Sequence, residues 1–252
     1  MLLAIDIGNS TTKFGIFESG SLIDKFVIPT VLDYTVDELS FDRLRYTDDR
    51  FFQIDAAIVS SVVPEMNGTL AEACKKLLKI TPSFVDYTFD FGMNVGYDPP
   101  SAAGTDRLVN AAAAAAKYGV PVIACSFGTA TTIDVVDSDR KYLGGTISPG
   151  LKTLVEALHL KTSKLPLVTI ERPKNVIGNT TKGSINSGTY YGHIGMVEGI
   201  LQRIFEELGQ KPKVVATGGF ASVVAENSSL IDVVDENLTL EGLLRLAERR
   251  SS

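Results

Sequence analysis

Two segments of this sequence resemble each other, and this internal repeat limits the fold more than any other feature. Residues 2–17 read LLAIDIGNSTTKFGIF, and residues 121–136 read PVIACSFGTATTIDVV. In each segment an apolar run predicts a buried strand, a loop of glycine and hydroxyl residues follows, and a β-branched run predicts a returning strand. A charged turn and a third strand come next in both segments. We therefore predict an α/β fold with two similar halves.

Helices and strands alternate along the rest of the chain. Apolar runs and helical periodicity predict strands over residues 55–63 and 213–217 and helices over residues 67–79, 108–117 and 189–208. We place the boundary between the halves in the turn Gly119–Pro121, because glycine and proline end helices. This gives a first half of residues 1–118 and a second half of residues 119–252.

Composition argues against several classes of function. The 252 residues carry a net charge of −6, so we expect neither a nucleic-acid-binding surface nor attraction to anionic membranes. No apolar run approaches the ~20 residues of a membrane span, and the N-terminus lacks the features of a signal peptide. The two cysteines, Cys74 and Cys125, lie far apart among apolar residues, so we expect buried thiols in a cytoplasmic protein.

The first loop could bind a phosphate group. It follows a strand that ends with Asp6, and it contains a glycine that exposes backbone N–H groups. Asp6 could hold Mg²⁺ through water, and Lys13 could contact a phosphate as a point charge. The loop residues between them are Gly8, Asn9, Ser10, Thr11 and Thr12. A hairpin turn in which Asp and Asn cap backbone groups explains the same residues equally well.

Two further glycine segments could complete a nucleotide site. The second loop contains Gly128, Thr129 and Thr131, and two such loops around one polyphosphate suit phosphoryl transfer, which depends on positioning and charge stabilisation. Gly218 and Gly219 end a predicted strand and could let an adenine or ribose ring lie against the backbone. The alternative for the second loop is a Thr-rich strand edge, and the alternative for Gly218 and Gly219 is a plain connecting turn. The sequence lacks the P-loop and Rossmann glycine patterns.

The segment Gly104–Arg107 opens the Ala-rich helix and could bind an acceptor substrate. Asp106 could act as the general base for a substrate hydroxyl, and the fork of Arg107 suits a carboxylate. The alternative is that Asp106 only complements the helix dipole in the first turn.

Together these motifs resemble type III pantothenate kinases in order and spacing across nearly the whole chain. They are Asp6–Ser10, Tyr97-x-x-Pro100, Gly104–Arg107, Gly128–Thr132, Gly144-Gly145-x-Ile147-x-Pro149-Gly150, Thr181 before Ser187-Gly188, and Thr217–Gly219. The resemblance implies a duplicated ribonuclease-H-like (actin-like ATPase) fold with two mixed sheets and flanking helices. It implies a homodimer that phosphorylates pantothenate with ATP, which is the first step toward coenzyme A.

The resemblance also implies roles for particular residues. Asp6 to Lys13 would contact the ATP phosphates and the Mg²⁺ region, and Thr129 would bind ATP. Asp106 would accept the proton of the pantothenate hydroxyl. The pantothenate site would be lined by Tyr97, Gly104, Thr105, Asp106, Arg107 and Thr181.

One position departs from the family pattern. Ser126 stands where the family has an Asp that helps to bind a monovalent cation such as K⁺ or NH₄⁺. A neutral hydroxyl is a poorer cation ligand, so we expect weak or absent activation by such cations. The departure also keeps open a nucleotide-binding regulatory protein without kinase activity. Another actin-like small-molecule kinase, which would share the loops without requiring Tyr97 or Gly104–Arg107, is the other alternative.

A stripe of glycines begins just before the predicted helix over residues 189–208 and continues along one face of that helix. Gly188, Gly192, Gly195 and Gly199 recur at helical spacing, which allows another helix to approach closely. The stripe could serve a homodimer or packing within the half, and the sequence leaves both open.

Overall fold

The structure is a computed structural model that describes residues 1–39 and 53–251. The chain forms two compact units, one of Met1–Ala116 with Asn237–Ser252 and the other of Lys117–Glu236. The break near residue 117 lies close to the boundary that we expected. Residues 237–252, which we expected in the second half, pack instead with the first unit.

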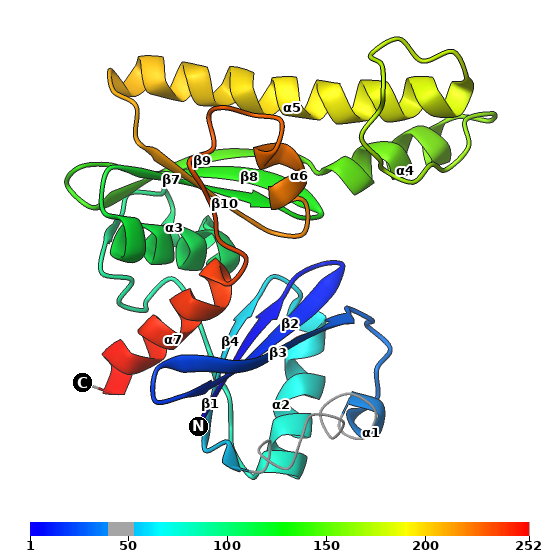
Figure 1. The fold of residues 1–252 in the computed structure, drawn as a ribbon. Helices are drawn as coiled ribbons and strands as arrows, with labels where there is room; N and C mark the ends of the chain where they lie inside the picture. Colours follow the sequence, from blue (N-terminus) through cyan, green and yellow to red (C-terminus); the bar gives the residue numbers. More distant parts are fainter. Residues whose placement is uncertain (40–52, 252) are drawn as a thin grey trace. The chain divides into compact units, whose positions relative to one another are not determined.

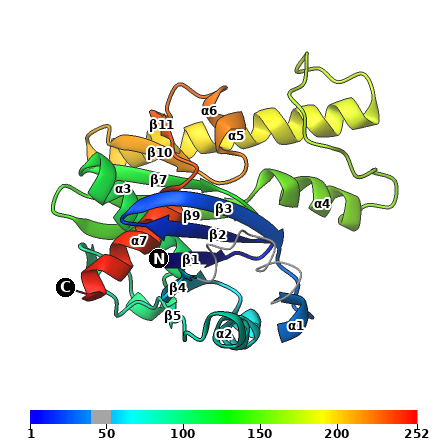
Figure 2. The same ribbon diagram turned by 60° about the horizontal axis from the view of Figure 1, so that its bottom comes forward.

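The first unit is built on a mixed five-stranded sheet. Its strands are β1 (Leu2–Ile7), β2 (Thr11–Glu18), β3 (Ser21–Pro29), β4 (Ala56–Ser61) and β5 (Ser83–Phe84). They follow the order β3-β2-β1-β4-β5, with β1 antiparallel to β2 and parallel to β4. Figure 2 shows these strands side by side. The carboxyl ends of β1 and β4 therefore lie at the same edge of the sheet.

Helices cover both faces of this sheet. Helix α2 (Pro64–Leu78) buries Met66, Leu70 and Cys74 in one core cluster with Leu3 and Ile5 of β1. Helix α7 (Leu238–Ser251) contacts β1 and β4. The other elements of this unit are α1 (Val36–Glu38), β6 (Asn94–Val95), the 3₁₀ helix η3 (Pro100–Ala102) and most of α3 (Thr105–Tyr118).

Helix α7 belongs to the first unit because its apolar residues are buried there. Gly242 of α7 lies so close to α3 that an added Cβ would be 2.8 Å from Val109 and 3.0 Å from Ala113. Thr239 Oγ1 donates a 2.7 Å hydrogen bond to Asn110 Oδ1. The buried leucines of α7 are Leu238, Leu240, Leu243 and Leu246. These long-range contacts explain why the C-terminal helix belongs to the first unit and not to the second.

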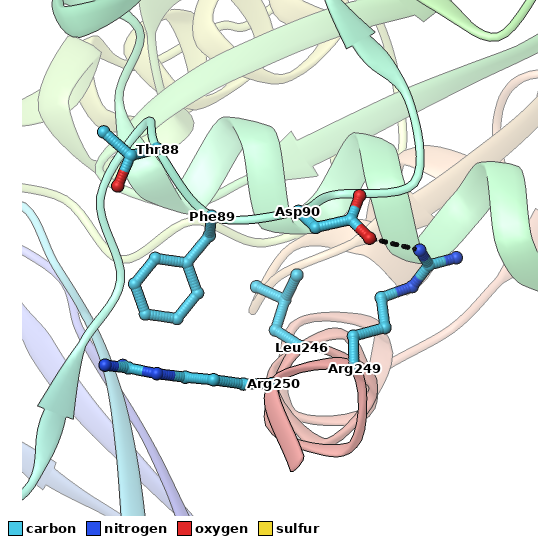
Figure 3. A pocket seen from close by; sticks show the side chains of 6 residues that line it. All are labelled: Thr88, Phe89, Asp90, Leu246, Arg249 and Arg250. Carbon is cyan, nitrogen blue, oxygen red and sulfur yellow. Dashed lines mark hydrogen bonds and ion pairs between the residues drawn. The ribbon is translucent and has the colours of Figure 1, made fainter. Parts of the chain in front are cut away.

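The end of α7 is fixed by charged residues at a small surface pocket. Arg249 Nη1 lies 2.9 Å from Asp90 Oδ2, and the Arg250 guanidinium lies 5.2 Å from the centre of the Phe89 ring. Figure 3 shows these pairs around a pocket of about 290 Å³, which Thr88 and Leu246 also line. The two arginines therefore anchor the C-terminal helix to the loop that follows β5.

The second unit repeats the sheet topology of the first. Its strands are β7 (Val122–Phe127), β8 (Ala130–Val136), β9 (Lys141–Pro149), β10 (Lys213–Thr217) and β11 (Val233–Val234). They follow the order β11-β10-β7-β8-β9, with β7 antiparallel to β8 and parallel to β10. This order matches β5-β4-β1-β2-β3 strand for strand. The duplication that the sequence repeat predicted is confirmed.

A long helix, α5 (Thr181–Leu208), packs along one face of the second sheet (Figure 1). Its residues Ile194, Val197 and Leu201 share a core cluster with Cys125 and Ile133 of the sheet. Helices α4 (Leu151–Lys161) and α6 (Ala221–Ala225) contribute to the same core. Helix α5 therefore covers one face of the sheet to which the loop between β7 and β8 belongs.

Most predicted elements are confirmed, although all three predicted helices begin earlier than expected, α2 at Pro64 instead of residue 67. The strand over residues 213–217 coincides with β10, and the predicted helices correspond to α2, α3 and α5. Helix α3 begins at Thr105 and α5 at Thr181, earlier than their apolar periodicity indicates. Both cysteines are buried free thiols, and burial raises the pKa of Cys74 to about 12 and that of Cys125 further.

Candidate active site

The first glycine loop is a hairpin connection between β1 and β2 that internal hydrogen bonds stabilise. The Gly8 N–H donates to the Thr11 carbonyl at 3.0 Å, and Thr30 Oγ1 donates to the Gly8 carbonyl at 2.7 Å. Thr12 is buried, and its hydroxyl lies 3.0 Å from Thr30 Oγ1. The Thr12 hydroxyl therefore supports the loop from inside, while Asn9, Ser10 and Thr11 are exposed residues of the loop and its edge.

Asp6 and Lys13 face each other across the base of this loop. They are direct partners in the β1–β2 register, and Lys13 Nζ lies 3.7 Å from Asp6 Oδ2. Burial raises the pKa of the Asp6 carboxyl, and the charge of Lys13 partly opposes that rise. A buried carboxylate that lacks full solvation gains from a bound cation, so Asp6 fits the role of an Mg²⁺ ligand.

The start of α3 is held at the same edge of the first sheet as Asp6. Asp6 lies opposite Ser60 in the parallel β1–β4 register. Ser60 Oγ lies 3.2 Å from Thr105 Oγ1, and Thr105 Oγ1 donates to the Ser61 carbonyl at 3.2 Å. These hydroxyl contacts place the residue after Thr105, which is Asp106, beside the carboxyl ends of β1 and β4.

Asp106, Arg107 and Tyr97 lie together in the first unit. Asp106 Oδ1 accepts a 2.8 Å hydrogen bond from the Arg107 N–H. The Arg107 guanidinium lies 5.6 Å from the centre of the Tyr97 ring, and Arg107 is only 4% exposed. A carboxylate, a cation and an aromatic ring thus gather at one helix N-terminus. Gly104 precedes the helix, and its carbonyl accepts hydrogen bonds from the Arg107 and Leu108 N–H groups at 3.1 Å.

The second glycine loop, between β7 and β8, is fixed by the start of α4. The Gly128 N–H donates to the Ala130 carbonyl at 3.0 Å. The Thr129 carbonyl accepts the Gly150 N–H at 2.9 Å and the Thr153 hydroxyl at 2.6 Å. An added Cβ at Gly150 would overlap the Gly128 carbonyl oxygen and lie 2.8 Å from that of Thr129. Only glycine therefore fits beside this loop at residue 150.

Gly218 and Gly219 lie beside the second loop within the same unit. Gly218 has φ +96°, and an added Cβ there would lie 2.6 Å from the Phe127 carbonyl oxygen. The same carbonyl accepts the Phe220 N–H at 3.2 Å. Two segments that the sequence analysis assigned to ATP thus meet at the carboxyl ends of β7 and β10.

The side chains of Thr131 and Thr181 do not lie with these two segments at the carboxyl ends of β7 and β10. Thr131 is 1% exposed, and its hydroxyl lies 2.8 Å from His193 Nε2 on the face of the sheet that α5 covers. Thr181 is the first residue of α5, twelve residues before His193, which corresponds to about 18 Å along the helix. The side chain of Thr131 is thus directed into the core, and Thr181 lies at the distant end of α5.

Ser126 is the structural counterpart of Asp6 in the second unit. Each residue is the penultimate residue of the central strand, and each precedes the glycine of its loop by two positions. Asp6 has Lys13 and Ser60 as cross-strand partners, whereas Ser126 has Thr132 and Thr217. Hydroxyl groups thus replace the carboxylate and the ammonium group at this position.

Other kinds of site receive little support from the described residues. Within residues 1–39 and 53–251, no three His, Cys, Asp or Glu side chains are grouped so that they could hold a metal ion. In the same part of the chain, every helix is too short or too polar to cross a bilayer.

Several supporting residues were absent from the sequence analysis. Thr30 and Thr153 bind the two glycine loops, and Ser60 binds the start of α3, through hydroxyl groups that belong to no motif. The local sequence offers no signal for them, because each contact joins residues distant along the chain. His193 had a signal, since it lies four residues before the buried Val197 on the apolar face of α5. A polar residue on a buried face indicates a bonded partner.

Comparisons with known proteins agree on one family. A family model described as type III pantothenate kinase matches residues 2–203. A type III pantothenate kinase from Koribacter versatilis (strain Ellin345) is 43% identical over 265 residues, covering 100% of this chain and 97% of the relative.

Solved structures support the fold. A Campylobacter jejuni protein assigned to the Baf family of transcriptional activators has a TM-score of 0.62 at 18% identity, covering 99% of this chain and 98% of its own. An inorganic polyphosphate/ATP-glucomannokinase from Arthrobacter sp. strain KM has a TM-score of 0.50 at 13% identity and covers 98% of both chains. At such identities the likeness shows the fold alone, which is the duplicated ribonuclease-H-like, actin-like ATPase fold.

Proposed function

Because the chain belongs to the type III pantothenate kinase family, we propose that it transfers the terminal phosphoryl group of ATP to the hydroxyl of pantothenate. The product is 4′-phosphopantothenate, and the reaction is the first step of coenzyme A synthesis. The single observation that carries this assignment beyond the family is the grouping of Asp6, Thr105 and Asp106 at one edge of the first sheet. In this proposal, Asp6 would serve as the cation ligand and Asp106, which follows Thr105, as the base at the same edge.

The nucleotide site that we propose uses a loop from each unit. The exposed loop of residues 8–11 and the ammonium group of Lys13 would contact the phosphates from the first unit. The loop at Gly128 and Thr129 would contact them from the second unit, and Gly218 with Gly219 would take the adenosine portion. Asp6 would hold Mg²⁺ through water, and the bound ion would supply positive charge to the triphosphate.

In the catalytic step that we propose, Asp106 accepts the proton of the pantothenate hydroxyl. The hydroxyl oxygen forms a bond to the terminal phosphorus of ATP while the bond from that phosphorus to the bridging oxygen breaks. The electron pair of the broken bond leaves with ADP. Arg107 and Tyr97 would orient the substrate, with the guanidinium binding its carboxylate. For Thr181, the first residue of α5, the role of pantothenate ligand rests on the family resemblance alone.

A coupled assay for ADP release tests this function directly. With ATP, Mg²⁺ and pantothenate, we expect turnover that depends on pantothenate. Turnover with a different alcohol acceptor and none with pantothenate would favour another actin-like kinase. Nucleotide binding without turnover on any acceptor would favour a regulatory protein. We place the reaction in the cytoplasm, where a reducing environment suits two buried free thiols.

We expect weak activation by K⁺ or NH₄⁺, because Ser126 offers a hydroxyl where a carboxylate would bind the ion. Activity with K⁺ should exceed that with a bulky organic cation at equal ionic strength by less than about twofold. The variant Ser126→Asp should gain K⁺ dependence, and Ser126→Ala should behave like the parent enzyme. Strong K⁺ activation of the parent enzyme would contradict this prediction.

We also propose that the chain forms a homodimer through the glycine stripe of α5. An added Cβ at Gly188, Gly192 or Gly195 would meet no atom within 4 Å, so close packing within the described residues does not explain these glycines. Light scattering should give twice the mass of 27.1 kDa. The variant Gly192→Arg should shift the protein toward the monomer, whereas Gly68→Ala on α2 should not. A parent protein that is monomeric at micromolar concentration would refute the dimer.

A further inference from the structure

His193 contacts both strands that flank the second glycine loop. Its Nε2 lies 2.8 Å from the hydroxyl of Thr131, near the start of β8. Its ring packs edge-on against Phe127, the last residue of β7, with ring centres 6.1 Å apart. Phe127 and Thr131 are direct partners across the β7–β8 pair. One side chain of α5 thus touches a residue of each strand that flanks the loop of Gly128, Thr129 and Ala130.

The surroundings of His193 favour one neutral tautomer. The residue is 1% exposed, and burial lowers its pKa to about 4, so the ring is neutral near pH 7. Nδ1 is buried and has no hydrogen-bond partner among the described residues. A buried N–H group without an acceptor is less well tolerated than a bare ring nitrogen. The proton therefore belongs on Nε2, which donates to the Thr131 hydroxyl.

The second loop is joined to neighbouring backbone, and its flank at Phe127 is shared with the segment of Gly218 and Gly219. Gly128 and Thr129 are joined to neighbouring backbone through the Ala130 carbonyl and the Gly150 N–H. Phe127 also carries the carbonyl that accepts the Phe220 N–H, next to Gly218 and Gly219. A shift of the β7 end would thus move both segments that we assign to ATP.

We propose that His193 is a positioning residue for ATP, which holds the second glycine loop in its binding geometry through Thr131 and Phe127. Thr131 then acts inside the core as the hydrogen-bond partner of His193, and Thr129 is the loop residue that meets the nucleotide. The inference rests on the proposed function, since it requires the second loop to bind ATP.

Calorimetric binding of a non-hydrolysable ATP analogue to the full chain tests the inference. His193→Phe keeps an aromatic ring beside Phe127 and removes the hydrogen bond, and Thr131→Val removes the partner hydroxyl. Each variant should raise the Kd for the analogue about fivefold to tenfold, and the double variant should be no worse than either single variant. Thr131→Ser keeps the hydroxyl and should restore a Kd near that of the parent enzyme. In steady-state assays the KM for ATP should rise while the KM for pantothenate stays constant.

Tyr190→Phe is the matched control. Tyr190 lies on the same face of α5, and its buried hydroxyl accepts a 2.7 Å hydrogen bond from Asn227 Nδ2. This variant should lower the Tm as His193→Phe does, without changing the Kd for the analogue. An equal rise in Kd for Tyr190→Phe would overturn the inference, and so would an unchanged Kd for His193→Phe.

Binding of the ATP analogue to the parent enzyme separates a failure of this inference from a failure of the proposed function. A parent protein that binds no ATP analogue refutes the proposed nucleotide site. A parent protein that binds the analogue, together with additive effects of His193→Phe and Thr131→Val, refutes the positioning role alone. The ¹⁵N shifts of the His193 ring give an independent readout, because they should report the Nε2–H tautomer in the parent and lose that signature in Thr131→Val.

Discussion

Replacing Asp106 with Asn should lower kcat for pantothenate phosphorylation by about 10²–10⁴-fold, the usual contribution of a general base. The amide is nearly isosteric with the carboxylate and can still accept the 2.8 Å hydrogen bond from the Arg107 N–H. The fold of the helix start should therefore persist. Because the change removes a proton acceptor and no ATP contact, the Kd for ATP should remain within about twofold of the parent value.

The matched control for this prediction is Asp33→Asn, which changes an exposed carboxylate of the same unit. It should leave kcat and Kd unaltered. Single-turnover measurements at saturating ATP would separate the chemical step from product release. A kcat of Asp106→Asn close to that of the parent enzyme would exclude Asp106 as the base, whatever its effect on pantothenate affinity.

Replacing Gly150 with Ala should abolish tight ATP binding and destabilise the second unit by about 2–4 kcal/mol, since an overpacked Cβ must displace backbone. The added Cβ overlaps the Gly128 carbonyl oxygen and approaches that of Thr129, so the loop must move away from α4. We assign no nucleotide contact to residue 150, so an effect of this substitution on ATP binding would reflect the geometry of the loop. Thermal unfolding and calorimetry with an ATP analogue measure the two effects.

Gly68→Ala provides the contrasting glycine variant. Gly68 lies inside α2, and an added Cβ there would meet no atom within 4 Å. The substitution should raise the unfolding free energy by about 0.5–1 kcal/mol, because alanine favours the helix, and should leave ATP binding unchanged. Parent-like ATP affinity in Gly150→Ala would show that the second loop does not need the geometry seen in this structure.

The repeated sheets were predictable because their signals are local. The runs before Gly8 and Gly128 are short, apolar and bounded by turn residues, so each identifies a buried strand without knowledge of its partners. The start of α3 was also visible, since Thr105 and Asp106 are typical of a first helical turn. The grouping of Asp6 with Asp106 also needs the contact of Thr105 with Ser60 beside the β1–β4 pair, which no local pattern reveals.

The placement of α7 and the orientation of Thr131 were not predictable in the same way. Helix α7 contacts β1 and β4, more than 170 residues earlier in the chain, and a local pattern cannot reveal which sheet an apolar helix covers. Thr131 looks like a phosphate ligand because it lies in a Gly/Thr loop. Its place in the alternation of β8 turns it toward α5 instead, where His193 binds it.

We propose that the loop at Gly8 and the loop at Gly128 contact the phosphates of one ATP and that Asp106 accepts the proton of the acceptor hydroxyl. A crystal structure of the full chain with a non-hydrolysable ATP analogue, Mg²⁺ and pantothenate tests it most directly. We expect one analogue per chain, with its phosphates touching both the loop at Gly8 and the loop at Gly128, and the pantothenate hydroxyl within hydrogen-bond distance of Asp106. Phosphates that contact one loop alone, or a hydroxyl remote from Asp106, would contradict it.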